Sequence, residues 1–532
     1  MVPVRELDLV LSGLPGPLPW SNITPSLSAE FCVSKGQQRI MTMTTPANLK
    51  SFSIGSQQFD GAGQTITSIY PGDGSVAGVV ARATPADVDR AVALAQDAYR
   101  HQPWRKLRPD QRATTLYEIG RRISVERDAL TTMQMFDSGK PRKECQNMVD
   151  NAASYFRYYA AICETWQNEM TSPRGDYFSM SLAEPFGVVA AITPWNSPIM
   201  AEAQKAAPAL AAGNAVILKP SEETPMLALE LARICTEAGL PEGLFTALPG
   251  YGEDVGAALV AHPGVRMVSF TGGTETGRAI ATVAGKRLIP VGLELGGKSP
   301  HIVFEEADLP MAMAGVISGI YGSAGQSCVA GTRLFVQRSI YREFVDELVA
   351  RSRQVKVGLP DDPAAQMGPL ISRAHRDRVA GYVDLARSEG GRVLCGGSAP
   401  DDPALAQGWF YLPTVIDGLQ NSARACQEEI FGPVLVTIPF DDEADVIAQA
   451  NDTVYGLAAG MWTRDVAKAW RVAREIEAGS IWINTYKQSH IATAFGGFKD
   501  SGIGREKGLH GLRLYSQVKS VFFGLQDKPL GL

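Results

Sequence analysis

The chain has 532 residues, too many for one compact core, so we expect two or three domains. Hydrophobic residues make up 45% and charged residues 20%, which is typical of an ordinary globular protein. The net charge of −6 and the scattered Lys and Arg residues argue against a nucleic-acid or anionic-membrane partner.

The seven cysteines and six histidines are spread singly, without a C-x-x-C pair or H-x-x-x-H spacing. We therefore expect free thiols, a cytoplasmic protein and no metal site. No window approaches the roughly 18 uncharged apolar residues of a membrane helix. Residues 1–45 carry LSGLPGPLPW and then a polar run, so we expect a disordered extension, with Met41 or Met43 as alternative first residues.

The first clear element is a helix over residues 108–137. Its apolar side chains recur at helical spacing, and Gly139 with Pro141 is expected to end it. Strands predicted at 187–193, 215–219 and 265–270 then alternate with helices at 201–213 and 226–239. Continuous apolar strands joined through helices predict a parallel, doubly wound sheet covered on both faces.

A second alternating block runs from about residue 301 to 494. It contains predicted strands at 301–304, 334–337, 434–440 and 481–486, with helices at 311–321 and 344–354. This pattern predicts a second α/β domain. Residues 515–523 read as a strand with no partner beside it in sequence, so we expect it to pair with another chain or with a distant sheet edge.

Residues 292–299, GLELGGKS, fit the spacing of a phosphate-binding loop. Such a loop requires a helix to begin at its Lys-Ser, because helix amides hold the phosphates. Here Pro300 follows, and residues 301–304 read as a strand, which disfavours a triphosphatase. Gly296 and Gly297 could alternatively form a plain tight turn.

Three side chains form a candidate constellation for acyl chemistry. Cys328 lies in GQSCVAGTR among small residues, where a substrate and backbone amides can reach it, although most single cysteines are core fillers. Glu294 offers a carboxylate base. Asn196 in TPWNSP follows a predicted buried strand, where its amide could stabilise an oxyanion.

These segments resemble the aldehyde dehydrogenase superfamily from about Pro85 to Phe523. The motifs that carry the resemblance occur in the family's order: TPWNSP, KPSEETP, FTGGTETG, LELGGKSP, GQSCVAGTR, EEIFGPV and FGGFKDSGIGRE. The resemblance implies a doubly wound NAD-binding domain over 46–162 and 187–296 and an α/β catalytic domain over 297–506. It also implies a small bridging sheet, over 163–186 and 507–523, that pairs subunits into a dimer or tetramer.

The resemblance also implies a mechanism. Cys328 as thiolate would attack the aldehyde carbon, and the Asn196 amide with the Cys328 backbone N–H would hold the oxyanion. Glu294 would activate a water that hydrolyses the resulting thioester to a carboxylic acid. Lys205 and Glu506 match positions that relay protons to Glu294, although Lys205 could alternatively be a solvated charge.

For the cofactor, no G-x-G-x-x-G follows a strand. Instead Gly272 and Gly273 are expected to open a helix at about Thr274, whose amides can receive a pyrophosphate. By resemblance, Lys219 and Glu222 bind the adenosine ribose, and Glu222 favours NAD over NADP, with NADP possible. The remaining implied cofactor contacts are Glu429 and Phe431 at the nicotinamide end and Trp195 in the cleft.

Substrate choice is expected from the tunnel leading to Cys328. The positions that the resemblance places there are Ser197, Ala201, Gln204, Ser489 and Phe495, with His490 adjacent. Small and polar walls predict a bulkier or polar aldehyde, with acetaldehyde a poor substrate. Two rival interpretations are a CoA-acylating relative and a non-catalytic protein on the same scaffold. The presence of both Cys328 and Glu294 favours a hydrolytic enzyme.

Overall fold

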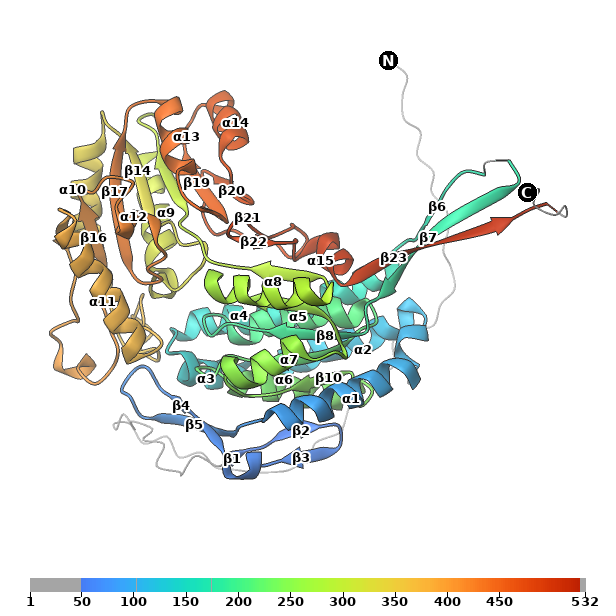
Figure 1. Cartoon of the computed structure of the whole chain (residues 1–532). Coiled ribbons are helices and arrows are strands. Elements are labelled where there is room, and N and C mark those ends of the chain that lie inside the picture. The colour runs from blue at the N-terminus through green and yellow to red at the C-terminus, as the bar shows by residue number, and fades with distance from the viewer. Residues whose placement is uncertain (1–48, 102, 174, 527–532) are drawn as a thin grey trace, which may run out of the picture. The chain divides into compact units, whose positions relative to one another are not determined.

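The computed structural model describes residues 49–101, 103–173 and 175–526. The predicted extension, residues 1–45, lies outside them. The described chain is built on two large α/β sheets and a small antiparallel sheet (Figure 1). Among the described helices, none combines the length and the apolar character needed to cross a membrane.

The first large sheet has the strand order β10-β9-β8-β11-β12-β22. Its strands are β8 (Val188–Ile192), β9 (Ala215–Lys219), β10 (Phe245–Ala247), β11 (Val265–Thr271), β12 (Val291–Glu294) and β22 (Gly502–Ile503). All neighbours are parallel except β22, which runs antiparallel to β12. The chain builds outward from β8 in one direction and then from β11 in the other, which confirms the doubly wound topology.

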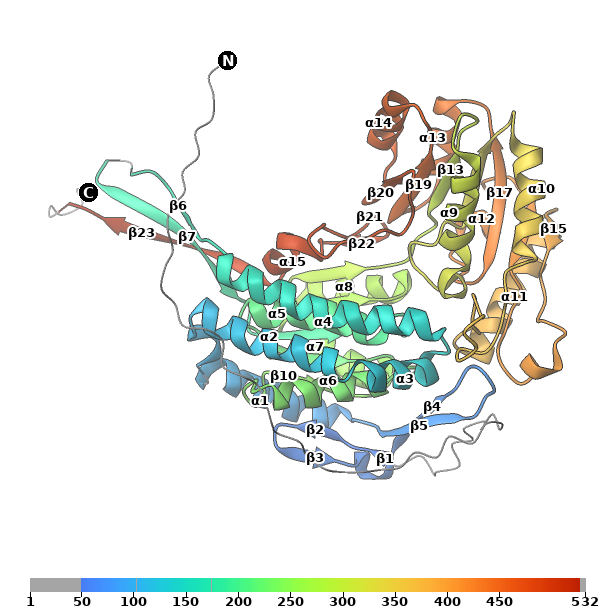
Figure 2. The same ribbon diagram turned by 180° about the vertical axis from the view of Figure 1, so that it is seen from behind.

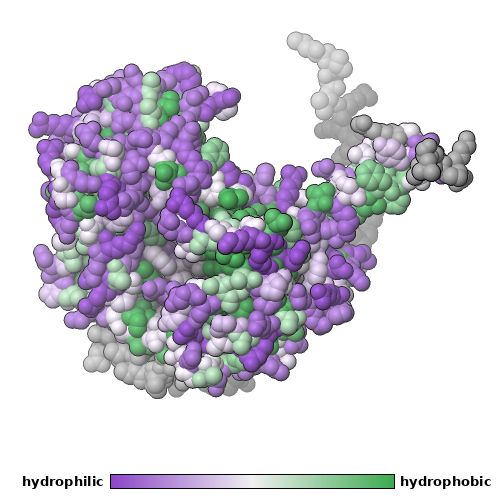
Figure 3. Space-filling model, viewed as in Figure 1, coloured by the Kyte–Doolittle hydropathy of each residue, from purple (hydrophilic) through white to green (hydrophobic). Residues whose placement is uncertain are grey.

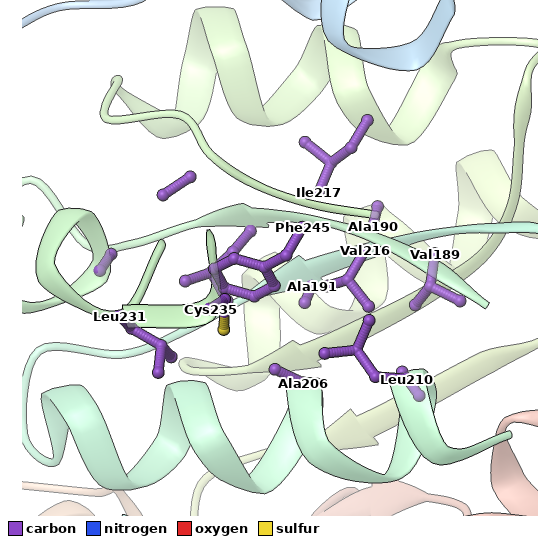
Figure 4. Close-up of a cluster of buried hydrophobic side chains, with 14 of the residues drawn as sticks. Val189, Ala190, Ala191, Ala206, Leu210, Val216, Ile217, Leu231, Cys235 and Phe245 are labelled. Atoms are coloured by element: carbon purple, nitrogen blue, oxygen red, sulfur yellow. The ribbon is translucent and has the colours of Figure 1, made fainter. Parts of the chain in front are cut away.

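Helices cover both faces of this sheet (Figures 1 and 2). One face carries α5 (Pro198–Ala211) and α6 (Met226–Glu237), and the other carries α1 (Pro85–His101), α7 (Ala257–Ala261) and α8 (Thr274–Arg287). Figure 4 shows Val189 and Val216 pointing toward Ala206 and Leu210 of α5, and all four side chains are buried. Because the strands are covered on both sides, their sequences are continuously apolar.

The prediction of a single helix over residues 108–137 is wrong, because two helices cover this range. They are α2 (Pro109–Val125) and α3 (Arg127–Ser138), and both contact α4 (Arg142–Thr165). The break falls at Glu126, whose backbone leaves helical geometry at ψ 13° and whose carboxylate pairs with Arg233 of α6. Gly139 ends α3 as predicted, in the left-handed conformation at φ 69°.

The second large sheet has the order β15-β16-β17-β14-β13-β19-β20. Its strands are β13 (Pro300–Val303), β14 (Arg333–Gln337), β15 (Arg392–Cys395), β16 (Thr414–Asp417), β17 (Val434–Phe440), β19 (Ala458–Trp462) and β20 (Ser480–Ile483). Its helices include α9 (Leu309–Tyr321), α10 (Tyr341–Ser352), α11 (Arg373–Ser388), α12 (Arg424–Gln427), α13 (Glu443–Asn451) and α14 (Val466–Glu475). Only β15 is antiparallel, which confirms a second α/β sheet.

Two details differ from the predicted elements here. Strand β20 ends at Ile483 rather than near residue 486, because Asn484 turns into the left-handed region at φ 53°. Strand β22 falls within the predicted catalytic range 297–506, yet it joins the first sheet beside β12. The predicted domain boundaries otherwise stay a prediction.

The C-terminal strand β23 (Ser516–Gly524) pairs antiparallel with β7 (Tyr177–Pro185), and β6 (Glu169–Met170) adds a third strand. The strand that lacked a neighbour in sequence therefore finds a distant sheet edge within its own chain. The ranges predicted for this sheet, 163–186 and 507–523, also contain helical residues. Helix α4 extends to Thr165, and α15 covers Gly508–Leu514.

Shorter strands complete the described fold. At the N-terminal side they are β1 (Leu49–Lys50), β2 (Phe52–Ile54), β3 (Gln57–Phe59), β4 (Thr65–Ile69) and β5 (Val76–Ala81). A further pair is β18 (Tyr455–Gly456) with β21 (Phe498–Lys499).

Candidate active site

The predicted site residues of the first sheet lie at one edge. Glu294 is the last residue of β12 and Lys219 the last of β9, while Asn196 follows β8 and Gly272 follows β11. All four strands are parallel, so their carboxyl ends meet at the same edge. The strand order reverses between β8 and β11, and ligands of open α/β sheets bind at such a switch point.

The segment that fits a phosphate-binding loop does not form one. Residues 295–299 join β12 directly to β13, so no helix begins at its Lys-Ser. A Cβ on Gly297 would lie 2.4 Å from the carbonyl oxygen of Cys328, so only glycine allows this approach. The loop therefore brings the end of β12 against the cysteine, and the triphosphatase interpretation lacks its required helix.

Asn196 reaches the loop that carries Cys328. Its amide donates a hydrogen bond to the backbone oxygen of Gln326, at 3.0 Å, two residues before the cysteine. Gln326 is itself held, since its side-chain oxygen accepts from the Ile371 amide at 2.8 Å. The predicted amide donor and the predicted nucleophile are thus brought together by a fixed backbone.

The side chain that carries the Cys328 thiol is half-buried. Burial raises its pKa to about 12, and the charges of Glu429 and Glu294 add to the rise. The ammonium groups of Lys487 and Lys507 act in the opposite direction and lower the pKa of this thiol. A thiol in this state needs a base, or a nearby cation, before it can act as a nucleophile.

Glu294 is buried and poorly satisfied. Its Oε2 has no hydrogen-bond partner among the described residues, and its Oε1 would lie 2.8 Å from a Cβ on Gly496. Burial raises its pKa well above the usual value, the charge of Glu506 raises it further, and Lys205 opposes the rise. An underbonded carboxyl with a raised pKa, next to a thiol, is suited to proton transfer.

Lys205 and Glu506 form a buried ion pair, with Nζ and Oε1 2.7 Å apart and exposures of 1% and 2%. The solvated-charge interpretation of Lys205 is therefore wrong. Lys205 also donates to the Ser269 hydroxyl at 3.0 Å, which accepts from the Tyr515 hydroxyl at 2.9 Å. The Glu506 charge is one cause of the raised Glu294 pKa, so the pair acts electrostatically on that carboxyl group.

Gln204, predicted as a tunnel wall, is held in the same network. Its amide nitrogen donates to Glu506, and its oxygen accepts from the Tyr155 hydroxyl at 2.7 Å. Of the other tunnel positions, Ser197 precedes the first residue of α5 and Ala201 is buried within that helix. Ser489 and Phe495 come from the loop after β20.

The residues predicted for the cofactor surround the same edge. Gly273 caps α8 without a side-chain hydrogen bond, and the first bond of this helix runs from the Gly277 amide to the Gly273 oxygen, at 3.0 Å. The amides before Gly277 therefore have no partner within the helix, which suits a phosphate group. The Lys219 ammonium lies 3.3 Å from the carboxylate of Glu222.

A second group of predicted cofactor residues comes from the second sheet. Glu429 accepts from the Gly297 amide at 3.0 Å, and burial raises its pKa. The Phe431 ring packs edge-on against Trp195, with ring centroids 5.3 Å apart and planes at 89°. Phe431 has a left-handed backbone at φ 61°, an arrangement that costs free energy and is frequent at functional sites.

Lys487 and Lys507 were missed by sequence reasoning. Both act electrostatically on Cys328, although they come from the loop after β20 and from the residue before α15. The sequence offered only a weak signal for these two residues. Lys487 follows Tyr486 and Lys507 follows Glu506, and neither segment shows an evident structural use for a charge.

A thiol and a carboxyl group near the switch point of a doubly wound sheet, with a second α/β sheet beside them, are what an α/β enzyme requires. The family model for the aldehyde dehydrogenase family matches residues 59–521. The chain belongs to the aldehyde dehydrogenase family and is an NAD(P)-dependent aldehyde dehydrogenase.

Two relatives illustrate the similarity in sequence. The betaine aldehyde dehydrogenase of Mesorhizobium japonicum is 42% identical over 470 residues, which cover 88% of this chain and 96% of that protein. The putative aldehyde dehydrogenase DhaS of Bacillus subtilis is 37% identical, over 92% of this chain and 99% of that protein.

Solved structures agree with this assignment. A putative aldehyde dehydrogenase from Burkholderia cenocepacia superposes with a TM-score of 0.89 at 39% identity, covering 92% of this chain and 100% of that one. Betaine aldehyde dehydrogenase from Staphylococcus aureus, in complex with NAD+, gives a TM-score of 0.88 at 36% identity, covering 90% of this chain and 96% of that one.

Proposed function

We propose that the protein oxidises an aldehyde to its carboxylic acid through a covalent intermediate on Cys328. The observation that carries the proposal is the grouping of the half-buried Cys328 with the buried Glu294 at the carboxyl end of β12, with Asn196 bound to the cysteine loop. The Cys328 sulfur attacks the carbonyl carbon and forms a hemithioacetal.

Asn196 and the Cys328 backbone amide donate to the oxygen that becomes negative during this attack. One such donor is worth on the order of 3 kcal/mol of barrier. NAD+, when bound, supplies the hydride acceptor that the oxidation requires. Loss of hydride converts the hemithioacetal to a thioester, and Glu294 accepts a proton from the water that hydrolyses it. Lys205 and Glu506 set the charge around Glu294 and pass on its proton.

The residues of the first sheet fit an NAD+ molecule. The unpartnered amides at the start of α8, after Gly272 and Gly273, suit its pyrophosphate, and Lys219 with Glu222 suits the adenosine ribose. Glu429, Phe431 and Trp195 would hold the nicotinamide end. The NAD+ complex of the relative from Staphylococcus aureus supports the same cofactor, with NADP as a second possibility.

The reaction is tested with the purified protein, NAD+ and an aldehyde panel in the absence of CoA. We expect NADH absorbance to grow without CoA, because the role proposed for Glu294 is to activate water. We further expect longer or polar aldehydes to exceed acetaldehyde in kcat/KM, since Ser197, Ala201 and Ser489 are small or polar. An absolute requirement for CoA would favour the acylating rival, and a maximum at acetaldehyde would reject the substrate assignment.

Cofactor choice provides a separate prediction. Replacing Glu222 by serine removes a carboxylate that repels the 2′-phosphate of NADP. The ratio of kcat/KM for NADP over NAD is expected to rise at least about tenfold, which corresponds to ~1.4 kcal/mol. Glu223 is the exposed neighbour of Glu222, so Glu223→Gln is the matched control. An unchanged ratio in Glu222→Ser would contradict the role of Glu222 in selecting NAD over NADP.

We also propose that the small sheet joins subunits into a dimer or tetramer in the cytoplasm. Its strands expose large apolar side chains, among them Met170, Val518 and Phe522, at 68%, 74% and 66%. Figure 3 shows hydrophobic residues gathered on this sheet. Exposed apolar strands of this kind usually mark a protein interface.

A further inference from the structure

We propose that Glu144 of helix α4 is a positioning residue for the nucleophile, because its carboxylate clamps the turn of residues 323–325 that leads into Cys328. The inference deepens the proposed function and rests on it, since the place of the sulfur matters only if Cys328 attacks the aldehyde. It is carried by hydrogen bonds and backbone angles on both sides of this turn.

The turn before the cysteine has an unusual backbone. Three consecutive residues are left-handed, Ser323 at φ 59°, Ala324 at φ 53° and Gly325 at φ 72°. Left-handed residues normally occur singly, because a Cβ in this region comes too close to the following carbonyl oxygen. Since Ser323 and Ala324 both carry a Cβ, the turn costs free energy and persists only where its surroundings enforce it.

Glu144 supplies a strong restraint on this turn. Its Oε1 accepts a hydrogen bond from the Ser323 amide at 3.0 Å, and its Oε2 accepts from the Ser323 hydroxyl at 2.6 Å. Hydrogen bonds to a carboxylate are stronger than those between neutral groups. Both carboxylate oxygens therefore hold the first left-handed residue of the turn.

The turn is also confined on its other side. A Cβ on Gly325 would lie 2.0 Å from the backbone oxygen of Gly432, so the turn is in close contact with the segment before β17. The side-chain amide of Gln326 donates to the backbone oxygens of Ser323 and Pro369, at 3.2 and 3.4 Å. The turn therefore has little room to move, except where Glu144 holds it.

The clamp acts close to the nucleophile. Only two residues separate the turn from Cys328, and the backbone oxygen of the first, Gln326, accepts from the Asn196 amide. Asn196 lies just before α5, which packs against α4. These two helices thus hold the cysteine loop at two points, Ser323 and Gln326. A displacement of about 1 Å can cost on the order of a hundredfold in rate.

Glu144→Gln tests the clamp, because it keeps the size of the side chain but replaces an accepting oxygen by a donor. With enzyme in excess over aldehyde and NAD+ saturating, the single-turnover rate of NADH formation is expected to fall at least about tenfold. The Kd for NAD+ is expected to change less than about threefold. Asp150→Asn is the matched control, since Asp150 is an exposed α4 carboxylate that pairs with Arg127 and should leave the rate unchanged.

A second substitution separates the clamp from a general loss of structure. Glycine adopts the left-handed region freely, so adding Ser323→Gly to Glu144→Gln should raise the rate at least about threefold above that of the single variant. An unchanged rate in Glu144→Gln, a fall that Ser323→Gly does not relieve, or an equal loss of NAD+ affinity would overturn the clamp. The proposed function fails separately, if Cys328→Ala remains active.

Discussion

Replacement of Cys328 by alanine is expected to reduce aldehyde oxidation at least about a thousandfold. Loss of a covalent nucleophile removes the pathway itself, and effects of this size are typical of such residues. NADH formation from a saturating aldehyde measures the loss. NAD+ binding, followed by fluorescence titration, is expected to persist, because the predicted cofactor contacts come from other segments.

Cys395→Ala is the matched control for this variant. Cys395 is another free thiol, and it is buried on β15 at the edge of the second sheet. Its replacement should leave turnover within about threefold of the wild-type value, since it removes only a small packing contribution. Substantial activity in Cys328→Ala, with the fold preserved by circular dichroism, would contradict the nucleophile assignment.

Replacement of Glu294 by glutamine is expected to slow turnover by about a hundredfold or more, within the range for a lost general base. Glutamine keeps the size of the side chain but cannot accept the proton of water. Rapid-mixing measurements should then reveal a first burst of NADH followed by slow hydrolysis of the thioester. A variant that turned over at the wild-type rate would remove Glu294 from the mechanism.

The raised pKa of Glu294 also predicts how the turnover of the wild-type enzyme depends on pH. Because burial and Glu506 raise the pKa of Glu294, this carboxyl holds its proton at pH values where an exposed glutamate is ionised. A base works only after losing that proton, so turnover is expected to rise with pH through the raised pKa. In Glu294→Gln this limb of the pH profile should disappear.

The alternating strands and helices could be predicted because both sheets are covered on two faces and their strands are continuously apolar. The site residues on the first sheet followed from their places after strands, as for Asn196 and Gly272. The break of the long helix at Glu126 was not predicted; in the structure the Glu126 carboxylate pairs with Arg233, more than a hundred residues away. Helical spacing continues across such a break.

Other parts of the site depend on long-range contacts that sequence patterns do not reveal. Strand β22 has only two residues and pairs with β12, which lies far from it in the chain. Lys487 and Lys507 have no local pattern, and their charges lower the pKa of the Cys328 thiol only in the folded chain. The sequence pattern predicts that Gln204 lies in a helix. Only the folded chain shows that its amide nitrogen donates a hydrogen bond to Glu506.

The most direct test of the account uses Glu294→Gln, in which the acyl group should remain on the enzyme. The variant is mixed with NAD+ and aldehyde, quenched in acid, and analysed by intact-protein mass spectrometry and peptide mapping. The account predicts a mass increase equal to the acyl group on the peptide that contains Cys328, larger than in the wild-type enzyme. An unmodified Cys328 after a measured burst of NADH would contradict it.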